Sequence, residues 1–191
     1  MKANAPGQSA LLLLDIIPLL EKRRLSYAVI GAFAASFYGA IRASLDADAV
    51  ISIKEKDIAP FMSEVQGLGL RISHDRGDAR DPVRAVIRVE DAFMNRVDLL
   101  LGIRGVGEDV FSRVVNAQFM DASINIVGIE DFIVMKIFAG GLKDIADVNG
   151  VLAVSKEKVD LPLLKNLISK HTPKEQEQLG KLLRAHYYTG S

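Results

Sequence analysis

The order in which strand-like and helix-like segments follow one another is the feature that most restricts the fold of this chain. Short apolar or alternating segments, which are typical of strands, recur through the first two thirds of the sequence. They lie at residues 27–30, 47–53, 71–74, 84–89, 96–103 and 123–127. Helical spacing separates several of them, including a helix expected over residues 106–115, and from residue 129 onward the pattern is helical. This order predicts an α/β (α+β) part followed by a helical part.

The change of pattern also predicts a domain boundary. We expect residues 1–128 to form the α/β core with an N-terminal helix, and residues 129–191 to form a helical part packed on it. Ser9 is expected to be the N-cap of the first helix, and Pro18 to break or kink that helix. Thr172-Pro173-Lys174-Glu175 has the sequence of a capping box with proline at the first helical position, and it is expected to open the last helix.

The composition limits the class of protein. Lys plus Arg and Asp plus Glu both number 24, which argues against a protein that coats nucleic acid irrespective of sequence, since such proteins carry a basic surplus. The absence of cysteine excludes disulfides, thiolate zinc sites and cysteine nucleophiles, and it fits a reducing compartment. Asp15 interrupts the leucines of residues 11–14, and no apolar run approaches the roughly 20 residues that a membrane span needs. We therefore expect a cytoplasmic protein.

Three aspartates form the candidate catalytic set. Asp46 and Asp48 lie two residues apart on a predicted strand, so both carboxylates project from the same face. Asp98 is a single charged residue within a predicted apolar strand. If the two strands are neighbours, the three carboxylates form a site for two Mg²⁺ ions, because hard cations prefer oxygen ligands. Such a site lowers the pKa of an acceptor hydroxyl and stabilises a leaving pyrophosphate, and Asp98 is also a candidate general base.

Residues before the aspartates have side chains or backbone suited to phosphate. Gly31 ends a predicted strand and opens a helix, and a glycine in such a turn lets backbone N–H groups approach a phosphate closely. Arg42 either offsets the carboxylate charge or binds a phosphate bidentately. The Ser44 hydroxyl either bonds a phosphate oxygen or caps the turn.

Together these residues resemble the nucleotidyltransferase superfamily, whose members have the DNA polymerase β-like fold. The matching segments are Ile30-Gly31-Ala32, Asp46-Ala47-Asp48 and Val97-Asp98-Leu99. Arg42 and Ser44 extend the match to the Arg-x-Thr/Ser-x-Asp-x-Asp version of the minimal and AbiEii-like nucleotidyltransferases. The resemblance implies a mixed sheet flanked by helices. It also implies binding of a nucleoside triphosphate and Mg²⁺, transfer of a nucleoside monophosphate to a hydroxyl, and release of pyrophosphate.

A later helical segment extends the resemblance. Residues 129–136, followed by Lys143-Asp144-Ile145-Ala146-Asp147, are similar to a motif of AbiEii-like and antibiotic nucleotidyltransferases, which implies that Lys136 contacts the triphosphate. Two positions depart from the pattern. Ala32, which the resemblance places beside the nucleotide, stands where the family prefers Gly or Ser, and Gly141-Leu142 replaces the Arg-Pro of many relatives.

The resemblance leaves the acceptor and any partner open. Acceptors across the resembled families include tRNA ends, protein side chains and small drug molecules, and a role as the toxin or antitoxin half of a pair with a small cognate partner protein is also implied. The two departures motivate an alternative, a catalytically inactive nucleotide- or partner-binding module of the same fold. Simpler interpretations are a surface Asp98 paired with Arg96 or Arg88, and a Lys136 whose ammonium group extends to solvent.

Overall fold

A seven-stranded mixed sheet forms the centre of the computed structural model, which describes residues 2–78 and 81–187. The strand order is β3-β4-β5-β2-β1-β7-β6. Pairs β2–β5 and β1–β7 are parallel, and the other neighbouring pairs are antiparallel, so the α/β class with a mixed sheet is confirmed. The strands are β1 Tyr27–Val29, β2 Asp46–Ile51, β3 Arg71–Arg76, β4 Val83–Glu90, β5 Arg96–Ile103, β6 Val115–Phe119 and β7 Ala122–Ile126.

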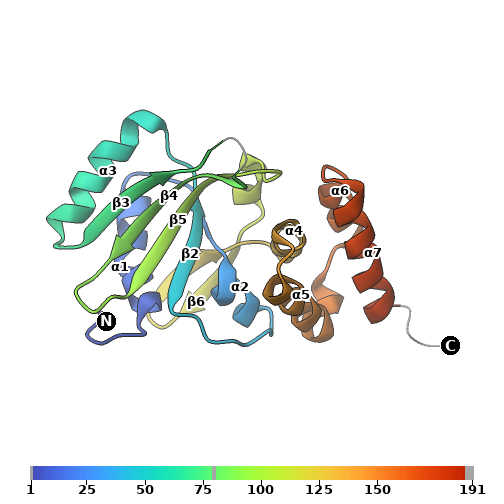
Figure 1. The fold of residues 1–191 in the computed structure, drawn as a ribbon. Coiled ribbons are helices and arrows are strands. Elements are labelled where there is room, and N and C mark those ends of the chain that lie inside the picture. The colour runs from blue at the N-terminus through green and yellow to red at the C-terminus, as the bar shows by residue number, and fades with distance from the viewer. Residues whose placement is uncertain (1, 79–80, 188–191) are drawn as a thin grey trace.

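Helices cover one face of this sheet, and further helices lie beyond one end of it (Figure 1). The α-helices are α1 Ser9–Lys22, α2 Gly31–Phe37, α3 Glu55–Gly67, α4 Ile129–Ala139, α5 Leu142–Ser155, α6 Leu161–Ile168 and α7 Pro173–Tyr187, with 3-10 turns η1 Glu108–Ser112 and η2 Lys156–Lys158. Alternate residues of β2, β4 and β5 are buried beneath α1 and α3, and their other residues face away from these helices.

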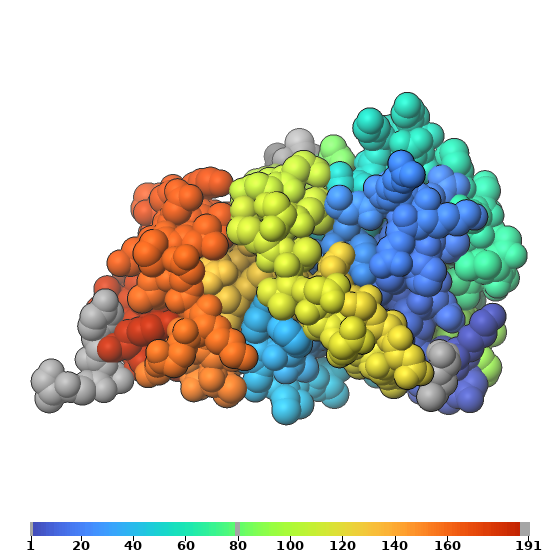
Figure 2. Space-filling model, turned by 180° about the vertical axis from the view of Figure 1, so that it is seen from behind, coloured from blue at the N-terminus to red at the C-terminus, as the bar shows by residue number. Residues whose placement is uncertain are grey.

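The helices that follow residue 128 gather at one end of an elongated molecule (Figures 1 and 2). A buried hydrogen bond joins them to the sheet part: the Ser155 hydroxyl on α5 donates to the carbonyl of Tyr38, the residue that ends α2, at 2.9 Å. The Tyr38 hydroxyl in turn donates at 2.7 Å to the carbonyl of Val127, which lies between β7 and α4. Arg113, which follows η1, forms a bidentate ion pair with Asp131 on α4 at 2.7 and 2.8 Å. None of the described helices is long and apolar enough to cross a membrane.

The expected N-cap of α1 is wrong, and the break expected at Pro18 does not occur. The N-cap is Gln8, and Ser9 is the first helical residue; its buried hydroxyl donates to the Leu45 carbonyl at 2.6 Å and accepts the Arg96 N–H at 3.0 Å. The helix also continues through Pro18, because buried apolar residues before and after the proline keep both halves packed on the sheet.

The helix expected over residues 106–115 is also wrong. It is replaced by the short η1, in which Val110 is the buried residue, and Val115 starts strand β6. Pairing with β7 satisfies the backbone of Val115–Phe119, so the chain from Val115 onward forms a strand. The glutamate half of the capping box before α7 is confirmed, since the Glu175 carboxylate accepts the Thr172 N–H at 2.7 Å and the Thr172 hydroxyl at 2.9 Å.

Candidate active site

The parallel pairing of β2 with β5 brings the three aspartates together. Asp48 is the register partner of Asp98, and Asp46 is the partner of Arg96. Because side chains alternate along a strand, Asp46, Asp48 and Asp98 project from the same face, the one that α1 and α3 leave uncovered. The expectation that the two strands are neighbours is therefore confirmed.

The carboxylates have different electrostatic surroundings. Burial, followed by the charges of Asp46 and Asp98, raises the pKa of Asp48 to about 6, against the opposing effect of Lys136 and Arg96. No cation among the described residues lies within ion-pair distance of Asp48. A hydrogen bond from the Ser44 hydroxyl at 2.7 Å lowers the pKa of Asp46 most, and Arg96 lowers it further. Asp48 is thus the member of the set that most lacks a positive partner.

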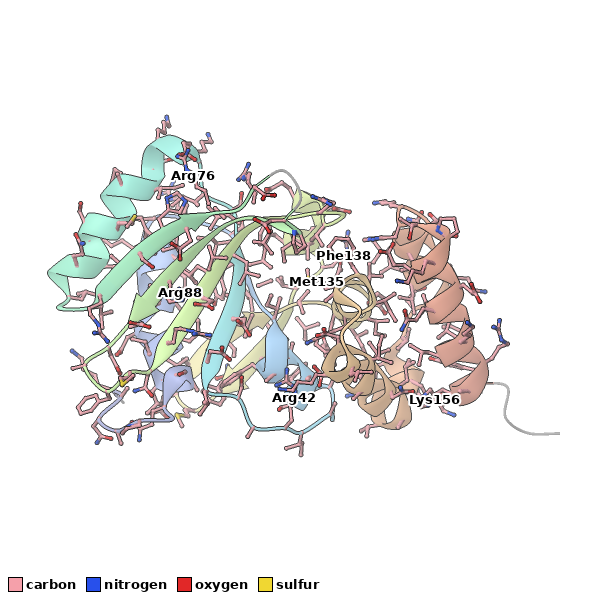
Figure 3. The ribbon with its side chains drawn as sticks, viewed as in Figure 1. Arg42, Arg76, Arg88, Met135, Phe138 and Lys156 are labelled. Carbon is pink, nitrogen blue, oxygen red and sulfur yellow. The ribbon has the colours of Figure 1, made fainter. Side chains whose placement is uncertain are left out.

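Two arginines hold the other carboxylates. Arg96 forms an ion pair with Asp46, and its Nε lies 3.5 Å from Oδ1 of Asp98. Arg88 on β4 approaches the same Asp98 oxygen with its Nε at 3.2 Å and extends along the uncovered face of the sheet (Figure 3). The pairing expected from the simpler interpretation of Asp98 is present. Asp98 is nevertheless no surface residue, because its side chain is only 14% exposed.

Gly31 provides space beside Asp48. A Cβ on residue 31 would lie 2.2 Å from Oδ2 of Asp48, and its φ of +64° is in the left-handed region that favours glycine. The neighbouring Ile30 N–H donates to the Asp48 carbonyl at 2.9 Å, which fixes the turn against β2. Ala32 is buried behind the turn. The visible role of Gly31 is therefore to leave the Asp48 carboxylate free of side-chain contact from the turn.

The two cations expected beside the nucleotide share one buried partner, Asp147 on α5. Lys136 Nζ lies 2.9 Å from Oδ2 of Asp147 and 2.8 Å from Oδ1 of Asp144. Arg42 contacts the two oxygens of Asp147 at 2.9 and 3.3 Å. Asp144 accepts the Gly141 N–H at 3.2 Å as a cap, but Asp147 is only 4% exposed and fixes both cations.

A cavity of about 270 Å³ lies between the sheet and α4, next to Asp48. Gly31, Asp48 and Lys136 form part of its wall, and apolar side chains of α4 form much of the rest. Met135 and Phe138 lie on the side of α4 that faces the sheet (Figure 3). These apolar residues were not identified from the sequence, because on a helix they have the same pattern as ordinary core positions.

Residues 13–187 match the family described as "Nucleotidyltransferase of unknown function (DUF6036)". The chain belongs to this family. It is therefore an enzyme of the nucleotidyltransferase class, and the superfamily resemblance is confirmed. No curated protein matches the sequence.

Solved structures of other nucleotidyltransferases share the fold. The antibiotic-resistance factor ANT(2″)-Ia aligns with a TM-score of 0.57 at 12% identity, covering 93% of this chain and 96% of its own. An antigenic nucleotidyltransferase-like protein from Paracoccidioides brasiliensis aligns at 0.51 and 13%, covering 98% and 100%. The lincomycin-bound lincosamide antibiotic adenylyltransferase LnuA aligns at 0.51 and 11%, covering 80% and 100%. At such identities the likeness concerns the fold.

The donor set of this nucleotidyltransferase fits a hard divalent cation in chemistry. Asp46, Asp48 and Asp98 offer carboxylate oxygens from one face of paired strands, and Gly31 leaves room beside Asp48. Among residues 2–78 and 81–187, however, no three acidic or histidine side chains already stand as a complete ligand set. Asp46 and Asp98 are turned towards arginines instead.

Proposed function

We propose that this nucleotidyltransferase transfers a nucleoside monophosphate from a nucleoside triphosphate to a hydroxyl acceptor, with two Mg²⁺ ions held by Asp46, Asp48 and Asp98. One observation supports this most: Asp48 lies opposite Asp98 on parallel strands, beside a cavity whose wall includes Lys136. A set of three carboxylates, of which Asp48 lines a mostly apolar cavity, suits the binding of cations together with a phosphorylated ligand.

The proposed reaction is an in-line displacement at the α-phosphorus. A bond forms between the acceptor oxygen and that phosphorus while the bond to the leaving pyrophosphate breaks. Asp98, whose carboxylate is 14% exposed on the open face, accepts the proton of the acceptor hydroxyl. When bound, Mg²⁺ supplies the charge that makes this hydroxyl more acidic and stabilises the pyrophosphate.

The nucleotide is proposed to lie between the sheet and α4. Lys136 contacts the triphosphate, because its ammonium group lies in the cavity wall and contributes to the electrostatic field at Asp48. Arg42 adds positive charge from the other side of Asp147. Ser44 acts on Asp46 rather than on a phosphate, since its hydroxyl already donates to that carboxylate. The apolar part of the cavity accommodates the nucleoside.

The acceptor is proposed to be a hydroxyl of a tRNA end, a protein side chain or a small molecule. The solved LnuA structure is bound to lincomycin, so small hydroxylated molecules are one class of acceptor to be tested. A toxin–antitoxin role with a small cognate partner protein is a further part of the proposal. An adjacent gene whose product copurifies with this protein and changes its transferase activity would support that role.

The proposed reaction is tested by incubating the protein with α-³²P-labelled nucleoside triphosphates, Mg²⁺, cell extract and lincosamides, and by separating RNA, protein and small molecules. Asp98→Asn is compared with Asp75→Asn, which removes an exposed carboxylate that also pairs with Arg88. We expect Mg²⁺-dependent labelling that falls at least about 100-fold in Asp98→Asn and persists in Asp75→Asn. Triphosphate binding by calorimetry without labelling of any fraction would instead support a binding module.

A further inference from the structure

One arginine spans two of the three proposed metal ligands. Arg96 is the register partner of Asp46 and lies two residues before Asp98 on β5, so its side chain projects from the face that carries both carboxylates. It forms an ion pair with Asp46, and its Nε lies 3.5 Å from Oδ1 of Asp98. The sequence of β5 therefore places a positive charge between carboxylates that come from two strands.

The contacts of Arg96 suit a side chain that another cation can displace. Its Nε is buried but has no hydrogen-bond partner among the described residues. Ionic attraction therefore holds the guanidinium in place without a complete set of hydrogen bonds. The side chain is 38% exposed, which leaves a path to solvent. Arg88, 36% exposed, contacts Asp98 alone within the carboxylate set, so Arg96 is the cation that ties Asp98 to Asp46.

We propose that Arg96 is the built-in counterion of the metal-free site, and that a divalent cation binds by displacing its guanidinium from Asp46 and Asp98. This inference rests on the proposed function, because it takes the three aspartates as the metal ligands. A cation that gathers all three carboxylates needs the oxygens that Arg96 now engages. Arg96 thus stabilises the protein without metal and competes with the metal.

Competition predicts two opposite effects of removing the guanidinium. Without Arg96, repulsion among the carboxylates is less compensated, so the metal-free protein loses thermal stability. The same change frees Oδ2 of Asp46 and leaves Oδ1 of Asp98 with Arg88 as its cation, so metal binds more tightly. A residue with a purely structural role would produce the first effect without the second.

The test uses the full chain without nucleotide. Calorimetry measures its affinity for Mn²⁺, and melting temperatures are measured in chelator. Arg96→Gln is compared with Arg71→Gln, a matched control on β3 that removes an arginine from the same row of the sheet. Arg71 is 66% exposed, and it pairs with Glu90 at 3.4 Å, outside the carboxylate set. We expect Arg96→Gln to bind Mn²⁺ about fivefold to tenfold more tightly than the unmodified protein, with a lower metal-free melting temperature. Arg71→Gln should leave the affinity unchanged.

Arg96→Lys provides a second measurement if Arg96→Gln fails to fold. A lysine keeps the charge but cannot present two nitrogens to separate carboxylates, so its Mn²⁺ affinity should also exceed that of the unmodified protein. Equal affinities in all proteins would overturn the inference. Weaker Mn²⁺ binding in the Arg96 variants would overturn it as well, because Arg96 would then position the carboxylates for metal. If the unmodified protein binds no Mn²⁺ even with a nucleoside triphosphate, the proposed function itself fails.

Discussion

Gly31 and Asp48 are in contact across the turn that joins β1 to α2: a Cβ on residue 31 would lie 2.2 Å from Oδ2 of Asp48. No carbon atom fits at that distance, so either the carboxylate or the turn must move when residue 31 gains a side chain. The turn is held to β2 by the hydrogen bond from Ile30 to the Asp48 carbonyl. The Asp48 carboxylate, and not the turn, is therefore expected to shift when residue 31 gains a side chain.

Gly31→Ala should consequently lose both stability and activity. The left-handed φ of +64° costs about 1–2 kcal/mol for alanine, and the steric overlap adds to it. Gly69→Ala is the control, because Gly69 has a φ of +79° but nothing lies within 4 Å of the position that a Cβ would occupy there. Urea denaturation should show the larger loss for Gly31→Ala, with Mg²⁺-dependent labelling reduced at least about tenfold in that variant alone. Equal behaviour of the two variants would mean that the contact with Asp48 has no consequence.

Asp48→Asn should stabilise the metal-free protein at neutral pH. The pKa of Asp48 is raised to about 6 in the folded state from an ordinary value of 3.8, so the folded state retains a proton that the unfolded chain has released between these pH values. The charged carboxylate therefore lowers stability increasingly as pH rises from about 4 to 6, and fully above that range. In chelator at pH 8 the variant should unfold with a free energy about 1–3 kcal/mol higher, and the difference should vanish below about pH 4.

Asp46→Asn is expected to have the opposite effect on stability: it should destabilise the protein at neutral pH. The Ser44 hydrogen bond and Arg96 lower the pKa of Asp46, so its charged form contributes stability that is present at neutral pH and is lost as pH falls through the lowered value. The variant should melt below the unmodified protein at pH 7, with a gap that narrows in acid. Destabilisation by both substitutions at pH 8 would contradict the assignment of Asp48 as the carboxylate without a cation.

The alternation of β2 and β5 explains why the carboxylate set could be predicted from the sequence. Buried residues at every second position fix which face Asp46, Asp48 and Asp98 occupy, and the register cannot shift by one residue without exposing the apolar face. Strand β6 lacked such a signal, because Ala117 is its buried residue and the other four positions are more exposed.

Local sequence patterns could not predict the partners of the site residues. Arg42 and Asp147 are separated by 105 positions and meet because α5 packs against α2 and the segment that follows it. Lys136 and Asp147 likewise belong to different helices. Spacing in the sequence identified these residues as charged groups of a motif, but tertiary packing determines that one buried carboxylate serves both cations.

Asp147→Asn tests that shared partner. Neutralising a carboxylate that is 4% exposed leaves Arg42 and Lys136 without their common counterion, although Arg42, 34% exposed, can turn to solvent. We expect a loss of about 2 kcal/mol in the free energy of unfolding and weaker triphosphate binding by calorimetry. Asp144→Asn, at a side chain 25% exposed, should cost about 1 kcal/mol or less. A larger effect at Asp144 would show that Lys136 depends on the cap of α5 rather than on Asp147.

Tyr38→Phe tests a buried hydrogen bond between the end of α2 and the segment that leads from β7 into α4. The Tyr38 hydroxyl is buried and donates to the Val127 carbonyl at 2.7 Å, immediately before α4, and burial raises the pKa of this phenol. Its removal leaves that carbonyl without the bond in a dry environment, at a cost of about 1–2 kcal/mol. Tyr187→Phe is the matched control, since its hydroxyl also donates to a backbone carbonyl, that of Lys156 at 2.6 Å, but is only partly buried, so water replaces the bond. Chemical denaturation should therefore separate the two variants, and a loss at Tyr187 as large as that at Tyr38 would show that burial does not set the strength of this connection.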